Sequence, residues 1–276
     1  MVRRGNSWWP QDATTVYADI QVEVCKSLLS KYEYDTVGQL LIPLQMSPTL
    51  SREKRFRIQR LRQLCQAFSL WDRFEHEAAL GLLEALGSPG IAPWIRRSKV
   101  LAGKVRKTNR FQIVADLVLN AERRVVQKKY VDAVARLYRA VEMLAQTRLV
   151  DKYQIDTSKV SLEKLPDVLR AKYSEMADES GNVVLSLQQA YELLMDFNDE
   201  LGLYFQGQRK KIGNALHVRN QSISGHGVAP VTEERYAECG RVFEDFIRSG
   251  LSVCRADVEW TQLPGEELVE LSEETR

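Results

Sequence analysis

Two residues in the last quarter of the chain, Arg219 and His226, form the pair best suited to chemistry. They stand seven positions apart. On a helix this spacing is two turns and about 700° of rotation, so both side chains would leave the same face. The chain holds only three histidines, and His217 lies in the same segment as His226. Arginine supplies a fixed positive charge and histidine exchanges protons near neutral pH, so the pair suggests a site that acts on a phosphodiester.

Cleavage of RNA is the reaction that this pair fits, because the ribose 2′-hydroxyl is a nucleophile that lies beside the phosphorus. A protein can then dispense with a metal if it transfers the proton, stabilises the charge on the phosphorane and holds attack and departure in line. His226 suits the proton transfer, and the planar fork of Arg219 matches two phosphate oxygens. Asn220 could orient either partner, and Ser222 could bond the phosphate or stabilise the helix.

Two glycines, Gly225 and Gly227, bracket the histidine. We expect them to end the helix and to let the sugar-phosphate backbone of RNA approach closely. A basic run upstream adds candidates for substrate binding, which together with the second histidine are Arg209, Lys210, Lys211 and His217. Such a run is also typical of a solvated helix face that has no function.

The same residues have a purely structural explanation as well. An arginine and a histidine at this spacing also occur by chance, and a histidine between two glycines can simply cap the terminal carbonyls of a helix. Arg219 would then pair with a helical carboxylate. The direct succession of Arg219 and Asn220, followed by Ser-Ile-Ser-Gly and His226, favours the functional interpretation.

The composition is that of an ordinary soluble chain. The 276 residues are 44% hydrophobic and 28% charged, which is enough material for one large or two modest domains. A net charge of +2 attracts no polyanion by itself, so a nucleic-acid site must come from local clusters of basic residues. The four cysteines show no Cys-x-x-Cys spacing, and we expect no metal and no cofactor. No apolar run is long enough for a membrane span or a secretory segment, so we expect a cytoplasmic protein.

Helical periodicity dominates and predicts an all-α fold. The predicted helices cover residues 13–31, 34–42, 52–70, 74–87, 109–128, 131–150, 161–178, 183–206, 208–224 and 232–255. The one short strand candidate is 258–263. Three helix junctions, at 31–37, 72–78 and 128–133, share a short polar turn with an aromatic residue, which aromatic plugs in helical hairpins explain without function. His76, in the second of these junctions, is expected to be exposed.

The segment 87–110 opens on Gly-Ser-Pro-Gly and is the best linker candidate. It separates a region of helical hairpins at residues 1–100 from a helical bundle at residues 109–255. Residues 256–276 form an acidic tail that we expect to be frayed.

The succession Arg219, Asn220 and His226 resembles the Arg-polar-x4–6-His motif of HEPN ribonucleases. Within them it is most similar to CRISPR-associated ancillary ribonucleases that end Arg-Asn-x-Ser-Ile-x-x-His-Gly. The resemblance implies an endoribonuclease of CRISPR or antiviral defence that cleaves single-stranded RNA without a metal, through attack of the 2′-hydroxyl, and leaves a cyclic phosphate. It carries over three catalytic residues by matching positions, and these are Arg219, Asn220 and His226.

The resemblance extends beyond the motif. The segments 120–124 and 130–142 are similar to the opening helices of the family, and the likeness spans roughly 109–255 and is vaguer over 10–90. It implies a bundle of four or five helices that forms a homodimer, so that two Arg/His sets line one composite cleft.

The chain departs from the CRISPR-type pattern in its first part. Those relatives carry an N-terminal Rossmann-like CARF domain that senses cyclic oligoadenylate. Residues 1–108 show neither βαβ alternation nor a Gly-rich turn after a strand. Cyclic oligoadenylate sensing would therefore need a domain that this sequence does not show. Either the sensor domain lies on a removed portion or on another chain, or this protein lacks it.

Two other functions stay open beside the nuclease. One is a non-catalytic helical adaptor in a defence or toxin–antitoxin complex, although a pure scaffold has no need for Arg219, Asn220 and His226 together. The other is an RNA-binding protein without turnover, which predicts steep salt dependence and no products. Single strands are the favoured substrate because in-line attack needs a splayed backbone that an A-form duplex resists.

Overall fold

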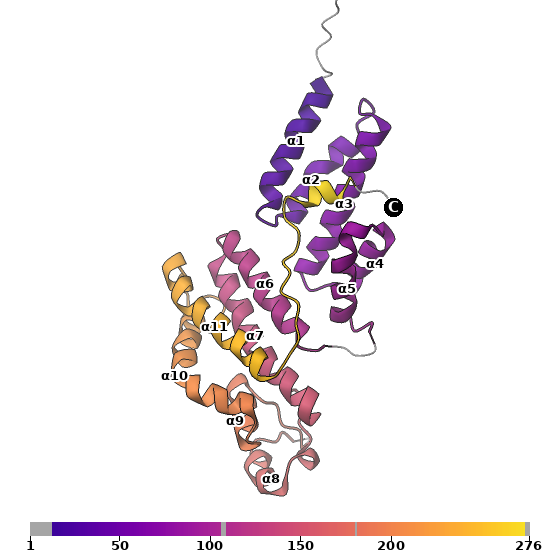
Figure 1. Cartoon of the computed structure of the whole chain (residues 1–276). Coiled ribbons are helices and arrows are strands. Elements are labelled where there is room, and N and C mark those ends of the chain that lie inside the picture. The colour runs from indigo at the N-terminus through magenta and orange to yellow at the C-terminus, as the bar shows by residue number, and fades with distance from the viewer. Residues whose placement is uncertain (1–12, 106–108, 180, 274–276) are drawn as a thin grey trace, which may run out of the picture. The chain divides into compact units, whose positions relative to one another are not determined.

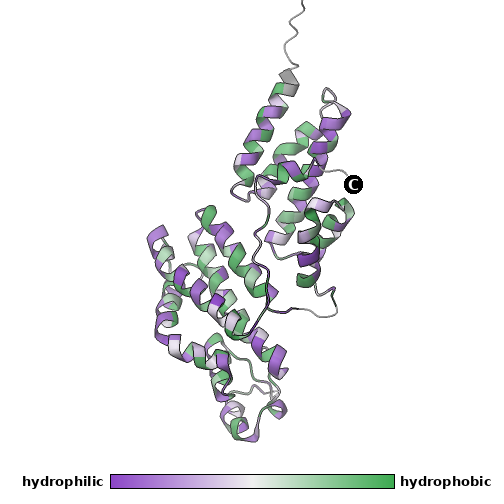
Figure 2. Ribbon diagram, viewed as in Figure 1, coloured by the Kyte–Doolittle hydropathy of each residue, from purple (hydrophilic) through white to green (hydrophobic). Residues whose placement is uncertain are grey.

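A computed structural model describes residues 13–105, 109–179 and 181–273, and helices make up nearly all of its regular structure (Figure 1). Within these residues the extended pairing is an isolated antiparallel bridge between Val160 and Val183. Figure 2 shows hydrophobic and hydrophilic residues alternating around the helices, as amphipathic helices require. The predicted all-α fold is confirmed. None of the described helices combines the length and the apolar character that a membrane span requires.

The chain divides into two compact units. The N-terminal unit comprises Met1–Arg106 together with Thr261–Arg276, and the C-terminal unit comprises Lys107–Trp260. The helices of the N-terminal unit are α1 (Ala13–Leu29), α2 (Tyr34–Gln45), α3 (Arg52–Asp72), α4 (His76–Leu86), the 3-10 turn η1 (Pro89–Ile91), α5 (Ala92–Leu101) and α12 (Leu268–Leu271).

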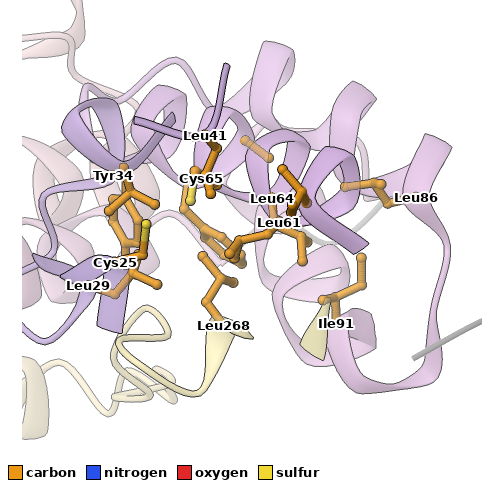
Figure 3. Packing of buried hydrophobic residues seen from close by; sticks show 14 of the residues in the cluster. Cys25, Leu29, Tyr34, Leu41, Leu61, Leu64, Cys65, Leu86, Ile91 and Leu268 are labelled. Carbon is orange, nitrogen blue, oxygen red and sulfur yellow. The ribbon is translucent and has the colours of Figure 1, made fainter. Parts of the chain in front are cut away.

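The acidic tail is packed rather than frayed over its described part. Leu263 and Leu268 are buried in the hydrophobic core of the N-terminal unit, and Figure 3 shows the Leu268 side chain among the other buried residues of that core. The hydroxyl of Tyr34 donates a hydrogen bond of 2.6 Å to the Pro264 carbonyl. The prediction of a frayed tail was based on the glutamates of this segment and overlooked its leucines, which anchor the segment in the core.

The predicted linker is also part of the N-terminal unit. Residues 89–101 form η1 and α5, Ile91 is fully buried, and the guanidinium of Arg97 stacks 4.7 Å from the ring centre of Trp71. The change of unit falls at residues 106 and 107, outside the described residues. The exposure predicted for His76 is wrong as well, because this side chain is 7% exposed and meets Trp71 edge-on at 5.9 Å.

The C-terminal unit is a bundle around one long helix. Its helices are α6 (Gln112–Val126), α7 (Tyr130–Tyr153), the 3-10 turn η2 (Leu162–Lys164), α8 (Asp167–Ser174), α9 (Leu187–Asp196), α10 (Glu200–Gln221) and α11 (Glu233–Val253). Helix α7 packs against α6, α9, α10 and α11. Leu137, Val141 and Leu144 of α7 are fully buried, as are Tyr191 of α9 and Phe243 of α11. The apolar stripe of α7 thus forms the centre of this core.

Several predicted helix boundaries are wrong in this unit. The break predicted near residue 207 does not occur, and α10 runs through it without interruption. The break lies instead at Asn198, whose φ of 51° ends α9. The helix predicted over 161–178 is reduced to η2 and the short α8.

The predicted strand at 258–263 is extended but does not pair with another strand. In the C-terminal unit, the side-chain amide of Gln112 donates to the Glu259 carbonyl and accepts from the Glu259 N–H, both at 2.9 Å. In the N-terminal unit, the indole N–H of Trp94 donates to the Gln262 carbonyl at 3.3 Å. The alternating pattern was real, but side chains satisfy the backbone in place of a neighbouring strand.

Four helix junctions use the same left-handed turn. The residues in positive φ are Tyr32 (56°), Phe74 (65°), Lys128 (58°) and Asn198 (51°). In each turn the next N–H bonds a carbonyl five residues back, as in a Schellman motif. A left-handed residue other than glycine costs roughly 1–2 kcal/mol. The helix-end hydrogen bonds and the packing of the next helix offset that cost, which gives the three shared junctions a structural explanation.

A buried carboxylate joins the end of α7 to the start of α10. The side chain of Asp199 is 0% exposed and lies 3.0 Å from Nη2 of Arg148 and 2.9 Å from Nζ of Lys152. It also accepts hydrogen bonds from the Tyr153 hydroxyl and from the Leu201 N–H, so it caps α10. Burial by itself would raise the pKa of Asp199, but these hydrogen bonds outweigh it and lower the pKa.

We expect Asp199→Asn to lower the free energy of unfolding by about 3 kcal/mol, because Arg148 and Lys152 lose their buried counter-charge. The contribution is complete above the ordinary aspartate pKa of about 3.9 and is lost as the pH falls through the depressed pKa of the folded state. Chemical denaturation at a series of pH values from 7 into the acid range measures this. The free energies of unfolding of the parent protein and of Asp199→Asn should converge as the pH falls.

Asp167→Asn is the matched control. Asp167 is 88% exposed and pairs with Arg170 at 2.8 Å, so its loss should cost under about 1 kcal/mol. Equal losses for the two variants at neutral pH would contradict the role assigned to Asp199.

Candidate active site at the end of α10

Arg219 lies in the last turn of α10 and is held on several sides. The central carbon of its guanidinium is 4.4 Å from the ring centre of Tyr138 on α7. Its Nη1 donates a hydrogen bond of 3.2 Å to Oδ1 of Asn220. Its Nε is buried and has no hydrogen-bond partner among the described residues. The structural alternative predicted that Arg219 pairs with a helical carboxylate. Among the described residues, Arg219 forms no such ion pair.

The loop 222–229 folds back over the end of the helix. Three carbonyls in the last turn accept hydrogen bonds from backbone N–H groups of this loop, from Ser222 to Arg219 (3.1 Å), from His226 to Asn220 (2.9 Å) and from Ala229 to Gln221 (2.9 Å). Uncovered carbonyls form the negative end of a helix and repel anions. The loop therefore covers the groups that would repel a phosphate near Arg219.

His226 lies in the loop that folds back over the end of α10, and not on a face of the helix. Helix α10 ends at Gln221, and Ser222 is its C-cap, so the predicted helix over 208–224 is too long at this end. The predicted two-turn spacing to Arg219 therefore does not apply. The backbone of His226 is held against the Asn220 carbonyl, and its side chain is exposed.

The two glycines have a structural use that was not predicted. A β-carbon at Gly225 would lie 2.6 Å from the Arg219 carbonyl oxygen, and one at Gly227 would lie 2.6 Å from the Gln221 carbonyl carbon. Both positions need glycine because the loop lies directly on the backbone of α10. The close approach is thus made by the protein's own chain.

Ser222 is a structural part of this end. It is 0% exposed, and its hydroxyl lies 2.8 Å from the Arg219 carbonyl and 2.8 Å from Oγ of Ser224. A buried hydroxyl with these partners is not placed to reach a phosphate. Of its two predicted roles, the structure favours helix stabilisation.

The other predicted binding residues precede Arg219 on α10. They are exposed along α10, and they are Arg209, Lys210, Lys211 and His217. His217 stands two residues before Arg219, which places it about 160° away around the helix. Arg209 lies 3.4 Å from Glu192, whereas the ion pairs of the described residues leave Lys210 and Lys211 without a carboxylate. The structure does not bring this set together with Arg219.

Three residues of this region were not anticipated. Tyr138 lies beside the buried Leu137 on α7, and no pattern in the sequence connects it with a position as distant as Arg219. Ile223 and Val228 flank His226 in the loop and are 75% and 89% exposed. The sequence shows both apolar residues beside the histidine and the two glycines. Their exposure could not be predicted, because it depends on the path of the loop.

An all-α bundle with an Arg-Asn pair at a helix end and a histidine in the following loop agrees with the resemblance to HEPN proteins. Residues 102–249 match the family model described as the Csm6 HEPN domain. The chain therefore belongs to this family of CRISPR-associated HEPN-domain proteins. The matched part includes Tyr138, Arg219 and His226, and the family indicates a nuclease role in CRISPR defence. Searches of curated proteins and of solved structures give no significant match.

We expect Gly227→Ala to displace the loop, because the added β-carbon meets the backbone of Gln221. The amide protons of His226 and Ala229, which are bonded to α10 carbonyls, should then exchange with solvent at least about tenfold faster. Native-state hydrogen exchange measures this directly.

Gly213→Ala is the matched control on the same helix. An added β-carbon there has nothing within 4 Å, so loop protection should be unchanged and α10 should gain about 1 kcal/mol of stability. Unaltered exchange in Gly227→Ala would show that the loop does not need glycine at this position.

Proposed function

We propose that the C-terminal unit is a metal-independent endoribonuclease of CRISPR defence that cleaves single-stranded RNA, with Arg219 and His226 as catalytic residues. The observation that carries the proposal is the fold-back of loop 222–229. It ties the His226 backbone to the carbonyl next to Arg219 while the imidazole stays exposed. Arg219, for its part, is not neutralised by any carboxylate of the described residues.

The reaction follows from the chemistry of these groups. The ribose 2′-oxygen attacks the neighbouring phosphorus, the bond from phosphorus to the 5′-oxygen breaks, and a 2′,3′-cyclic phosphate and a 5′-hydroxyl result. The proton lost from the 2′-hydroxyl is matched by one gained at the 5′-oxygen, and His226 serves this transfer. Arg219 stabilises the charge on the phosphorane oxygens. Asn220 fixes the guanidinium through Oδ1.

The exposed basic residues 209–211 of α10 extend the substrate surface in this proposal. Lys210 and Lys211 are exposed and have no carboxylate partner among the described residues, and Arg209 has only a long contact of 3.4 Å with Glu192. Single strands bind such cations through their phosphates without regard to sequence. His217 lies about 160° around the helix from Arg219 and is assigned no part in proton transfer or in substrate binding.

We propose further that the active form is a homodimer in which two Arg/His sets share one cleft. Ile223 and Val228 support this arrangement, since they hold large apolar side chains in water on both sides of His226. Burial of such residues favours association, and a twofold axis beside the loop would cover both copies at once.

Replacement of Arg219 or His226 by Ala should reduce cleavage of a fluorescent single-stranded RNA in EDTA by about 10²–10⁴-fold. His217→Ala is the matched control and should stay within a few-fold of the parent, because its side chain faces the other side of α10. Mass spectrometry should find a cyclic phosphate on the product. Full chelator-insensitive cleavage by both Ala variants would remove these residues from the mechanism, and tight RNA binding without products would favour the binding alternative.

Ile223→Glu and Val228→Glu should shift the protein from dimer to monomer in sedimentation velocity, with cleavage falling in parallel. Val168→Glu is the control, since Val168 is 84% exposed on α8, away from the loop in sequence. A parent protein that is monomeric at the concentrations where it cleaves RNA would refute the shared cleft.

A further inference from the structure

We propose that Tyr138 is a positioning residue that holds the Arg219 guanidinium in the plane needed to meet the phosphate. The inference rests on the proposed function of Arg219. It assigns to the ring of Tyr138 a role in the reaction although the ring itself touches no substrate.

The contacts of the guanidinium define its orientation. One face lies on the Tyr138 ring, with 4.4 Å between the central carbon and the ring centre. The Nε edge is buried, and Nη1 is bonded to Asn220. Nη2 makes no hydrogen bond to the described residues and, unlike Nε, is not buried. The free donor edge therefore carries Nη2 and the second hydrogen of Nη1.

The chemistry of the contact explains why a ring is suited to this task. A carboxylate would orient an arginine but would also neutralise it and compete with the phosphate. An aromatic face attracts the cation through its quadrupole and leaves its full charge for the substrate. Because a displacement of 1 Å in an active site can cost about 100-fold in rate, a platform that fixes the plane of the guanidinium has a large kinetic effect.

The platform itself is rigid. Tyr138 is half-buried on α7, and its neighbours Leu137 and Val141 are fully buried in the core of the C-terminal unit. The backbone that carries the ring cannot move without disturbing that core. The ring face, and not the hydroxyl, is the part of Tyr138 in contact with Arg219.

The test compares Tyr138→Phe, which keeps the ring, with Tyr138→Leu, which removes it. We expect Tyr138→Phe to cleave single-stranded RNA within about threefold of the parent, because cation–π attraction does not need the hydroxyl. Tyr138→Leu should lose about 10- to 100-fold in kcat with little change in KM. Tyr138→Met, which keeps more of the side-chain length, should show the same loss and serves if the Leu variant does not fold.

A double-mutant cycle separates positioning from a general structural effect. In an Arg219→Ala background, single-turnover cleavage should fall no further when Tyr138→Leu is added, because the ring acts only through the missing side chain. A full additional loss in that background would overturn the inference, and so would a Phe variant as impaired as the Leu variant.

The inference and the proposed function fail in different ways. If Arg219→Ala is inactive while both ring-free variants keep the parental kcat, the positioning role is overturned and the nuclease proposal stands. If Arg219→Ala cleaves like the parent, the proposed function fails and the positioning role fails with it.

Discussion

The arrangement of the C-terminal unit depends on the ion pairs of the buried Asp199 carboxylate with Arg148 and Lys152. This carboxylate starts α10 and, through Arg148 and Lys152, ties that start to the end of α7. Helix α10 has 22 residues and is therefore about 33 Å long, so a small tilt at its first turn becomes a displacement of ångströms at Arg219. The tie at one end of the helix thus sets the precision at the other.

At the far end of α10, one set of hydrogen bonds both caps the helix and positions the proposed catalytic histidine. The loop 222–229 caps the last carbonyls of the helix, as helix ends generally require. One of these bonds holds the backbone of His226 against the carbonyl of Asn220, the residue that follows Arg219. The capping role of the segment is therefore compatible with the proposed catalytic role, because the backbone of His226 is itself part of the cap.

Local sequence patterns predict the fold class and the motif of the candidate site. The features that they do not predict depend on residues that are distant in the chain. Periodicity revealed the all-α fold, and the family was visible in the succession of Arg219, Asn220 and His226. The break at Asn198 was not visible, since the partners of Asp199 lie on another helix. The contact of Tyr138 was hidden because helix packing creates it. The glycines were recognised, but their use against α10 follows from the path of the loop.

The division of the chain has a consequence for its biosynthesis. The C-terminal unit is continuous in sequence, whereas the N-terminal unit includes the segment with Leu263 and Leu268. A nascent chain leaves the ribosome from its first residue onward, and domains fold as units. The N-terminal unit therefore completes its core only after the segment with Leu263 and Leu268 has been made, whereas the HEPN bundle can fold before that segment is translated.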